Sequence, residues 1–223
     1  MIAFFSFKLN DAVYSIGKYA FMNCKSLEKI TIPEEIEVLY PSAFAGCISL
    51  SEIVWEGAPT LIGDKALSYC NALQSIVIPE GVRVLGDSVF SQSLELARVE
   101  LPDTVEEMGI SLFADCTALR EVKLPEKITA IPNATFLGCT GLLTVEIPDS
   151  VRIIDQNAFA ECSSLVSVVL PSELYAVRKN AFLQCDRIAE VKYPKAPEQF
   201  SSVFVAEGND ALVSAYWADK KTY

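Results

Sequence analysis

The sequence contains no histidine among its 223 residues, and this absence limits the chemistry open to the chain. Histidine is the commonest general base and metal ligand, so most catalytic triads, dyads and zinc sites are excluded. Basic residues are also few, with 18 Lys and Arg against 29 Asp and Glu, which gives a formal net charge of −11. An acidic surface of this size argues against binding of nucleic acid or of anionic membranes.

Long hydrophobic runs are missing as well, although 51% of the residues are hydrophobic and a real core is expected. No stretch approaches the roughly 20 apolar residues that cross a bilayer, so we expect no membrane insertion. The N-terminus, MIAFFSFKLND, has neither a basic start nor a small-residue cleavage site and is a poor secretory signal. The sequence does not say whether a longer precursor carries an export signal, so the localisation is left unassigned.

Motifs for catalysis or phosphate binding are lacking too. The glycines form neither a G-x-G-x-x-G nor a P-loop pattern, and no motif places a base beside a nucleophile. The acidic pairs Glu34–Glu35 and Glu106–Glu107 follow the expected strand ends, in turns that we expect to be solvated. We therefore expect neither an enzymatic activity nor a cofactor.

What the sequence does contain is a repeat of 23 residues. A phenylalanine column runs from Phe21 to Phe182, with Leu67 as its exception, and prolines recur from Pro33 to Pro194. No single unit can bury its apolar side alone, so the units must stack into a solenoid. The clearest column consists of cysteines, with Ser93 in the one remaining slot: Cys24, Cys47, Cys70, Cys116, Cys139, Cys162 and Cys185.

One unit reads roughly I-x-x-x-A-F-x-x-C-x-x-L-x-x-I-x-I-P-x-x-V-x-x. Its L-x-x-I-x-I part alternates with period two at its end and predicts a short strand, which the proline then ends. The A-F-x-x-C part predicts a single helical or 3₁₀ turn. Stacked strands would pair in parallel about 4.8 Å apart, so we expect one continuous sheet.

These motifs resemble the BspA-like class of leucine-rich repeats over about residues 4–217. The resemblance implies a leucine-rich-repeat solenoid that is mostly β. This would be a curved right-handed coil with a parallel sheet on its concave side and short helical or 3₁₀ turns on its convex side. It also implies the absence of catalysis, and commonly a surface or secreted protein of a host-associated microbe that binds other proteins.

We expect a single domain over residues 1–223. Residues 1–15 would form a partial N-terminal repeat, residues 16–199 eight full repeats, and residues 200–223 a degenerate C-terminal repeat with a cap. Because nothing precedes the first repeat to cover its core, we expect either a domain of a longer protein or self-association through the N-terminal edge.

The strand template also fits residues at both ends of the chain. Phe4, Phe7 and Leu9 match it one repeat before the first full strand. Leu212, Ala215 and Trp217 match it after a one-residue insertion. The tail ADKKTY would then close the array, with Trp217 as a lid.

The cysteines allow three interpretations. Disulfides are disfavoured because equivalent Cβ atoms on stacked coils lie near 4.8 Å, outside the roughly 3.5–4.5 Å that a disulfide prefers. A metal site is disfavoured because the sequence contains no C-x₂₋₄-C pair. We therefore expect a column of free, buried thiols and no metal site.

One repeat departs from the pattern at three places. Trp55 occupies an inward strand position, Glu56 replaces the proline and Leu67 replaces the phenylalanine. A compensated packing change is the simpler interpretation, because the larger indole would fill the space that the smaller leucine leaves. The alternative is a local bulge that exposes Trp55 as an anchor for a partner.

The residue after each proline is often acidic, as at Asp103, Glu126 and Asp149. Stacked turns would bring these carboxylates close together, as a negative ridge for a basic partner or a weak Ca²⁺ site. Solvated turns that keep the solenoid soluble are the simpler interpretation, because no loop such as D-x-D-x-D-G is present.

The outward positions of the strands are the better candidates for a binding site. They combine apolar and charged side chains, and an apolar surface with arginines suits contacts between proteins. The alternative is a wet sheet with cross-strand ion pairs that each contribute about 0.2–1 kcal/mol. The candidate residues on this concave face are Val54, Val77, Arg98, Glu100, Arg120, Lys123, Glu146 and Val169.

These observations predict a non-catalytic scaffold that binds a protein or peptide through the concave sheet. Surface adhesion or interaction with a host extracellular protein is the expected setting. The alternative is a structural spacer or self-assembly segment of a longer surface protein, which the incomplete first repeat favours.

Overall fold

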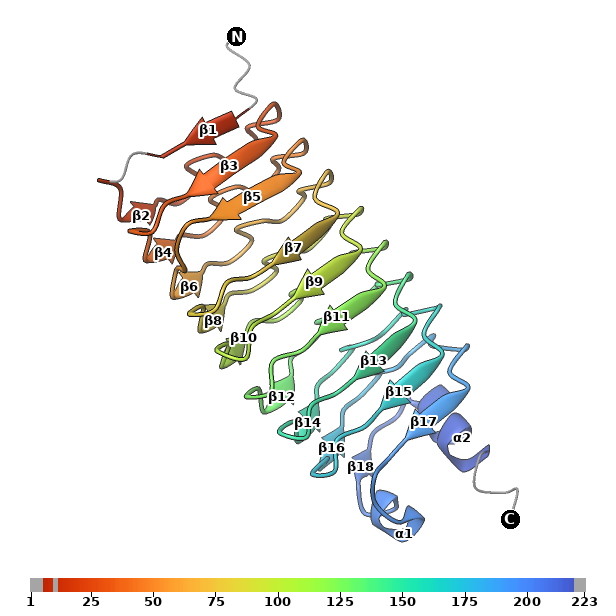
Figure 1. Ribbon diagram of the computed structural model, residues 1–223. Helices are drawn as coiled ribbons and strands as arrows, with labels where there is room; N and C mark the ends of the chain where they lie inside the picture. The colour runs from red at the N-terminus through yellow and green to blue at the C-terminus, as the bar shows by residue number, and fades with distance from the viewer. Residues whose placement is uncertain (1–5, 10–11, 219–223) are drawn as a thin grey trace.

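The computed structural model describes residues 6–9 and 12–218 and shows a stack of coils that runs along the long axis of the molecule (Figure 1). Each coil contributes one strand to one face, a second strand of two residues to another face, and a segment of turns that closes the coil. The solenoid that the repeat predicts is therefore confirmed.

The strands fall into two series. The long strands form what we call the long-strand face, the side predicted to be concave: β1 (Ser6–Lys8), β3 (Lys29–Ile32), β5 (Glu52–Trp55), β7 (Ser75–Val77), β9 (Arg98–Glu100), β11 (Glu121–Lys123), β13 (Thr144–Glu146), β15 (Ser167–Val169) and β17 (Glu190–Lys192). The short strands are β2 (Ser15–Ile16), β4 (Val38–Leu39), β6 (Leu61–Ile62), β8 (Val84–Leu85), β10 (Glu107–Met108), β12 (Ala130–Ile131), β14 (Ile153–Ile154), β16 (Ala176–Val177) and β18 (Phe204–Val205).

Neighbouring long strands pair in parallel, and their register equals the repeat. Ile30 in β3 pairs with Ile53 in β5, and Val99 in β9 pairs with Val122 in β11. Phe7 pairs with Ile30 in the same way, which confirms that the strand template begins before the first full repeat. Leu9 packs partly buried against the core, whereas Phe4 lies outside the described residues.

The expectation of one continuous sheet is wrong, because the long strands form three sheets: β1-β3-β5, β7-β9-β11 and β13-β15-β17. The first interruption follows the irregular repeat at Trp55, and the second lies between β11 and β13. The Val166 N–H donates to the Leu143 C=O (2.9 Å), and this bond joins two successive coils. Among the described residues, the equivalent bond between the Leu143 N–H and the Arg120 C=O is absent.

The short strands are interrupted once, between β10 and β12. In this column the Gly109 N–H donates to the Leu85 C=O (2.8 Å), and the Asp155 N–H donates to the Ile131 C=O (2.9 Å). Pro132 occupies the position between these two residues and has no N–H to donate. The ladder therefore stops at the coil where the proline stands.

The segments around A-F-x-x-C are hydrogen-bonded turns, and the predicted helical or 3₁₀ turns are not formed there. In the second coil the Ala43 N–H donates to the Tyr40 C=O (3.2 Å). Ser42 and Gly46 have φ angles of 57° and 74°, and such left-handed residues cannot continue a right-handed helix. The turns also bond from coil to coil, as the Phe44 N–H does to the Ala66 C=O (2.9 Å).

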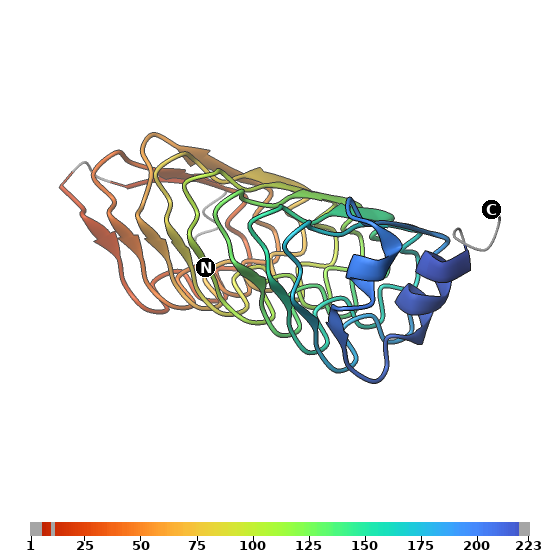
Figure 2. The ribbon, with the colours of Figure 1, turned by 90° about the horizontal axis from the view of Figure 1, so that it is seen from below.

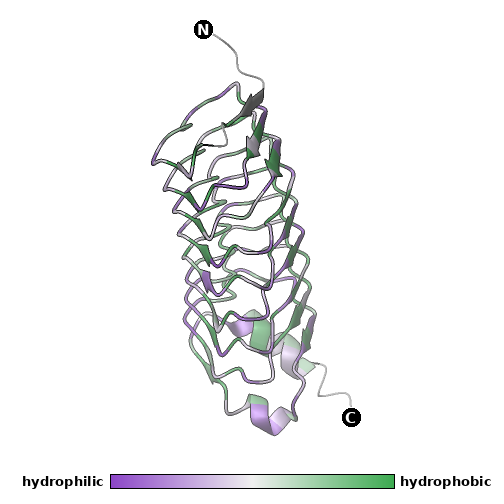
Figure 3. Ribbon diagram, turned by 60° about the vertical axis from the view of Figure 1, so that its left-hand side comes forward, coloured by the Kyte–Doolittle hydropathy of each residue, from purple (hydrophilic) through white to green (hydrophobic). Residues whose placement is uncertain are grey.

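The core lies inside the coils and is built from the columns of the repeat. Hydrophobic residues recur along successive coils (Figure 3). The phenylalanine column is buried and stacked, with ring centroids 5.3 Å apart for Phe113 and Phe136 and 5.0 Å apart for Phe136 and Phe159. Leu67 is fully buried in the same column, where it interrupts the stack of rings.

The cysteines of the described coils are all free, and six of the seven are buried. The Cys139 thiol donates to the Phe113 C=O of the preceding coil (3.1 Å), and the Ser93 hydroxyl donates in the same way to the Leu67 C=O (3.1 Å). This shared bond explains why serine can replace cysteine in the column. The expectation of a buried thiol is wrong for Cys24, which lies in the first coil and is exposed.

The irregular repeat keeps its tryptophan against the core. Trp55 ends β5, pairs with Ile32 and packs half-buried on the core cluster, while Leu67 fills the phenylalanine slot. Without the proline, the Glu56 N–H donates to the Ile32 C=O (2.9 Å). This arrangement agrees with a compensated packing change and not with an exposed anchor.

The C-terminal end differs from the expected strand, because Leu212, Ala215 and Trp217 lie in helix α2 (Asp210–Ala218). Leu212, Ala215 and Tyr216 are buried with helical spacing. The shorter helix α1 (Pro197–Phe200) lies with α2 at this end of the stack (Figure 2). Tyr216 is the buried lid, with its ring centroid 4.0 Å from that of Phe200 and 5.1 Å from that of the half-buried Trp217.

Asn209 explains why a helix can close the stack. Its side chain accepts a hydrogen bond from the Phe182 N–H (2.9 Å) and donates to the Arg178 C=O (2.9 Å). A side chain thus replaces the backbone of a further coil, and the chain is free to become helical directly after it. The remainder of the predicted ADKKTY tail after Ala218 lies outside the described residues.

We expect Phe136→Ala to lower the free energy of unfolding by about 3–5 kcal/mol, because the fully buried ring leaves a cavity between two stacked neighbours. Leu143→Ala is the control, since Leu143 is 47% exposed and its truncation should change stability by no more than about 0.5 kcal/mol. Denaturant unfolding followed by circular dichroism measures both. A loss under about 1 kcal/mol for Phe136→Ala would contradict a packed phenylalanine column.

The buried thiols should also make the fold sensitive to alkali. Burial raises the pKa of the Cys47 and Cys116 thiols from the ordinary value of 9.0 to about 12. The unfolded chain therefore loses these protons first, and the free energy of unfolding should fall as the pH rises from 9.0 toward 12. Unfolding measured at successive pH values should show a smaller fall for Cys116→Ser than for the unaltered chain. Equal falls would mean that this thiol is not buried.

Candidate protein-binding surface

Outward and inward side chains alternate along the long strands. In β9, Val99 is buried while Arg98 is exposed and Glu100 is half-buried. The structure places the predicted site residues at such outward positions, with Arg120 directly before β11: Val54, Val77, Arg98, Glu100, Arg120, Lys123, Glu146 and Val169. Their shared face is thus established, and their role in binding stays a prediction.

The strand registers bring some of these residues together. Val77 pairs with Glu100, and Glu100 pairs with Lys123, so these three lie on adjacent strands of the middle sheet. Glu146 pairs with Val169 in the C-terminal sheet. Val54 lies apart from them in the N-terminal sheet, beyond the first interruption.

Ion pairs on this face are exposed and only partly follow the expected cross-strand pattern. Lys29 and Glu52 do pair across strands, at 2.6 Å. Arg98 pairs with Glu100 of its own strand, at 2.8 Å, and is not paired across the sheet. Exposed pairs of this kind contribute about 0–1 kcal/mol each, so they explain little of the fold's stability.

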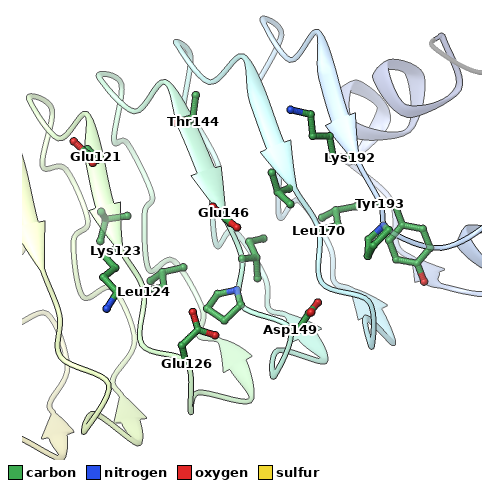
Figure 4. A pocket seen from close by; sticks show the side chains of 15 residues that line it. Glu121, Lys123, Leu124, Glu126, Thr144, Glu146, Asp149, Leu170, Lys192 and Tyr193 are labelled. Atoms are coloured by element: carbon green, nitrogen blue, oxygen red, sulfur yellow. The ribbon is translucent and has the colours of Figure 1, made fainter.

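A hollow of about 660 Å³ opens on the long-strand face at the second interruption of the sheet (Figure 4). It extends from β11 across the interruption and over β13 and β15 to β17, and residues of all four strands line it. Three of the predicted residues line this hollow, namely Lys123, Glu146 and Val169. Its apolar lining includes Leu124 and Leu170, which are buried core residues, and the ring of Tyr193.

The charged residues around the hollow are unevenly paired. Lys123 pairs with Asp103 at 3.4 Å and Lys192 with Glu190 at 3.2 Å, and neither of these two carboxylates lines the hollow. Four exposed carboxylates do line it, and within the described part of the chain none of them forms an ion pair: Glu121, Glu126, Glu146 and Asp149. The lining of the hollow therefore carries an excess of negative charge, although Asp149 also accepts a hydrogen bond from the Ser172 N–H (2.8 Å).

The pairing of Lys192 is reinforced from the neighbouring strand. The Ser167 hydroxyl donates a hydrogen bond to Glu190 (2.8 Å). This bond, together with Lys192, lowers the pKa of the Glu190 carboxyl. Glu190 thus stays ionised and pairs with Lys192, so this lysine of the lining already has a partner outside the hollow.

Several residues of the hollow were not predicted as site residues. Glu126 and Asp149 belong to the acidic column after the proline, which the sequence suggests is a solvated turn. Glu121 shares its column with the predicted Arg98, and Tyr193 ends the column of inward residues. The sequence offers one signal for Glu126 and Asp149: the acidic column comes directly after the prolines that end the long strands, so its carboxylates lie at one end of the long-strand face.

The chemical groups of this surface are few in kind. Among the described residues, no group of three or more Cys, Asp or Glu side chains is placed to hold a metal ion. No helix within residues 12–218 is long and apolar enough to cross a bilayer. What the surface offers is carboxylates, lysines and apolar side chains carried by the long strands and the turns that follow them.

Solved structures from three bacteria resemble this chain. A leucine-rich repeat protein from Bacteroides ovatus is 28% identical, with a TM-score of 0.73, and the match covers 86% of this chain and 55% of that one. The T. pallidum leucine-rich repeat protein TpLRR is 25% identical, with a TM-score of 0.59 and coverages of 82% and 78%. The chain thus spans about half the length of the B. ovatus protein.

A leucine rich cell surface protein from Faecalibacterium prausnitzii shares the fold, with 20% identity, a TM-score of 0.60 and coverages of 91% and 82%. A search of curated proteins finds no match. The family model for a BspA type leucine rich repeat region, of six copies, matches residues 2–120 and 86–207. Its repeats generally serve as non-enzymatic scaffolds for interactions. Because these matches take in most of the sequence, the chain belongs to the family of BspA-type leucine-rich repeat proteins.

Proposed function

We propose that this chain is a non-catalytic protein-binding scaffold and that its long-strand face is the binding surface. The observation that carries the proposal is the hollow, where exposed carboxylates without ion-pair partners surround an apolar lining on the long-strand face. Its volume of about 660 Å³ is in the range of common ligand pockets, and it can take several side chains of a partner.

The charge of the hollow indicates the chemistry of the partner. A partner segment with Lys or Arg side chains would compensate Glu121 and Glu146, and its apolar side chains would cover Val169. Arg120 lies outside the hollow, is exposed and forms no ion pair within the described chain, so it can meet a carboxylate of the same partner. Complementary charge of this kind sets specificity and the rate of association.

The setting that we propose is extracellular, with a protein or peptide of a host or of another cell as the partner. The support for this setting is the solved relative from F. prausnitzii, which is a leucine rich cell surface protein. Adhesion would then follow from many weak contacts along the face, since an elongated solenoid offers a long binding surface.

Peptides selected from a random library on the immobilised chain should be enriched in Lys and Arg, and their binding should depend on the hollow. Glu121→Gln combined with Glu146→Gln should weaken binding about tenfold or more, because two compensating carboxylates are lost. Isothermal titration calorimetry measures this change.

The matched control is Glu34→Gln combined with Glu80→Gln, which removes the same charge from exposed positions outside the hollow. This control should bind as tightly as the unaltered chain. An equal loss of affinity in both double variants would show that net charge, and not the hollow, attracts the peptides.

A further inference from the structure

We infer that the coil from Glu121 to Ile131, here called the joint coil, is an articulation at which the solenoid bends. Its long strand β11 pairs with β9 of the preceding coil, and its short strand β12 pairs with β14 of the following coil. Among the described strands, β11 has no partner on its other side, and neither has β12. This inference rests on the backbone and does not depend on the proposed function.

On the short-strand side, the joint coil is detached from the coil before it. The Arg152 N–H donates to the Thr129 C=O (2.9 Å), and the Glu106 N–H donates to the Arg83 C=O (2.9 Å). No such bond joins the Thr129 N–H to the Glu106 C=O among the described residues. Pro132 removes the next donor of the same ladder, so this junction has lost both of its repeating bonds.

On the long-strand side, the joint coil is detached from the coil after it. The Leu143 N–H lacks the bond to the Arg120 C=O that its equivalents make one coil earlier and one coil later. Those equivalents are the Arg120 N–H, which donates to the Ala97 C=O (3.0 Å), and the Val166 N–H. The two junctions of the joint coil are therefore open on opposite faces.

The turns of the coils remain bonded through both junctions. The Phe113 N–H donates to the Thr135 C=O (2.8 Å), and the Phe136 N–H donates to the Ala158 C=O (2.7 Å). The stacked phenylalanine rings run through the same coils. The continuous turns thus act as the hinge line, and the detached strands supply the freedom to open and close around it.

The hollow of the long-strand face lies across this articulation. Glu121 and Lys123 come from the joint coil, whereas Glu146, Val169 and Lys192 come from the coils beyond the open junction. Bending at the junction therefore changes the width of the hollow, and any segment bound in it contacts both sides. A partner that fits one width would select that bend of the solenoid.

Amide hydrogen exchange on the folded, full-length chain tests the detached junctions. The Leu143 and Thr129 amides should exchange at least about tenfold faster than the Val166 and Arg152 amides, after correction for sequence. The latter two occupy the same positions one coil later, where the ladder is intact. Equal protection at the two pairs of positions would overturn the inference.

Distance measurements between spin labels test the bending itself. Labels at Arg98→Cys and Ser167→Cys lie three repeats apart across the joint coil. Labels at Lys29→Cys and Arg98→Cys lie three repeats apart before it, across the first interruption of the long strands, where the short strands stay paired. Cys24→Ser removes the exposed native thiol from both variants. The first pair should give a distance distribution about twofold wider than the second. Distributions of equal width would contradict an articulation.

The role of the proline is tested by Pro132→Gly, which supplies the missing N–H without adding a side chain. The ladder between β10 and β12 should then close, slowing exchange at Thr129 about tenfold. Pro171→Gly is the matched control, because it gives the same backbone freedom to the coil of β15 and β16, whose strands are paired on both sides, and should leave Thr129 unchanged. Unchanged exchange at Thr129 in Pro132→Gly, or equal slowing in both variants, would count against the inference.

Discussion

The structure depends on one constraint, which is that every coil before the last has the length of one 23-residue repeat, whereas β16 and β18 in the last coil pair with a longer offset. The register of each paired long strand is therefore one repeat, as for Val99 and Val122, and a residue meets its own equivalent on the next coil. Interior columns then form from contacts between adjacent coils alone. The free energy of folding is therefore nearly a sum of one contribution from each coil and one from each interface between adjacent coils. The same constraint makes a single irregular residue act on one junction, as Pro132 does between β10 and β12.

Much of the interior could be predicted because inward positions demand one kind of side chain. Most members of the phenylalanine and cysteine columns lie inside the coils. Both columns recur every 23 residues, and this period sets the length of a coil. The substitution at Ser93 follows from a bond that sequence alone does not show, since the hydroxyl and the thiols donate to the same carbonyl column. Cys24 breaks the rule because it lies in the first coil and is exposed.

The turn conformations and the C-terminal helix could not be predicted, because they depend on whether each backbone N–H donates within its own coil or to the neighbouring coil. The left-handed residues Ser42 and Gly46 do not share a residue type, so the sequence pattern suggests a helical turn where the chain makes separate turns. At the C-terminal end, Asn209 replaces the backbone of a further coil, and a helix follows although the apolar residues also fit a strand. The outward placement of the candidate residues was predictable, whereas the hollow spans an interruption of the sheet that no residue column indicates.

The regular core and the candidate binding surface therefore depend on different features of the backbone. Where ladders are complete, outward side chains on paired strands sit at fixed intervals of one repeat. Where a ladder stops, neighbouring strands are released from that interval, and the hollow bordered by Glu121 and Glu146 lies at such a place. Loss of a few backbone bonds costs the solenoid little, because the turns and the phenylalanine stack continue through the joint coil. Local loss of regularity is thus how a uniform repeat can acquire one distinct surface.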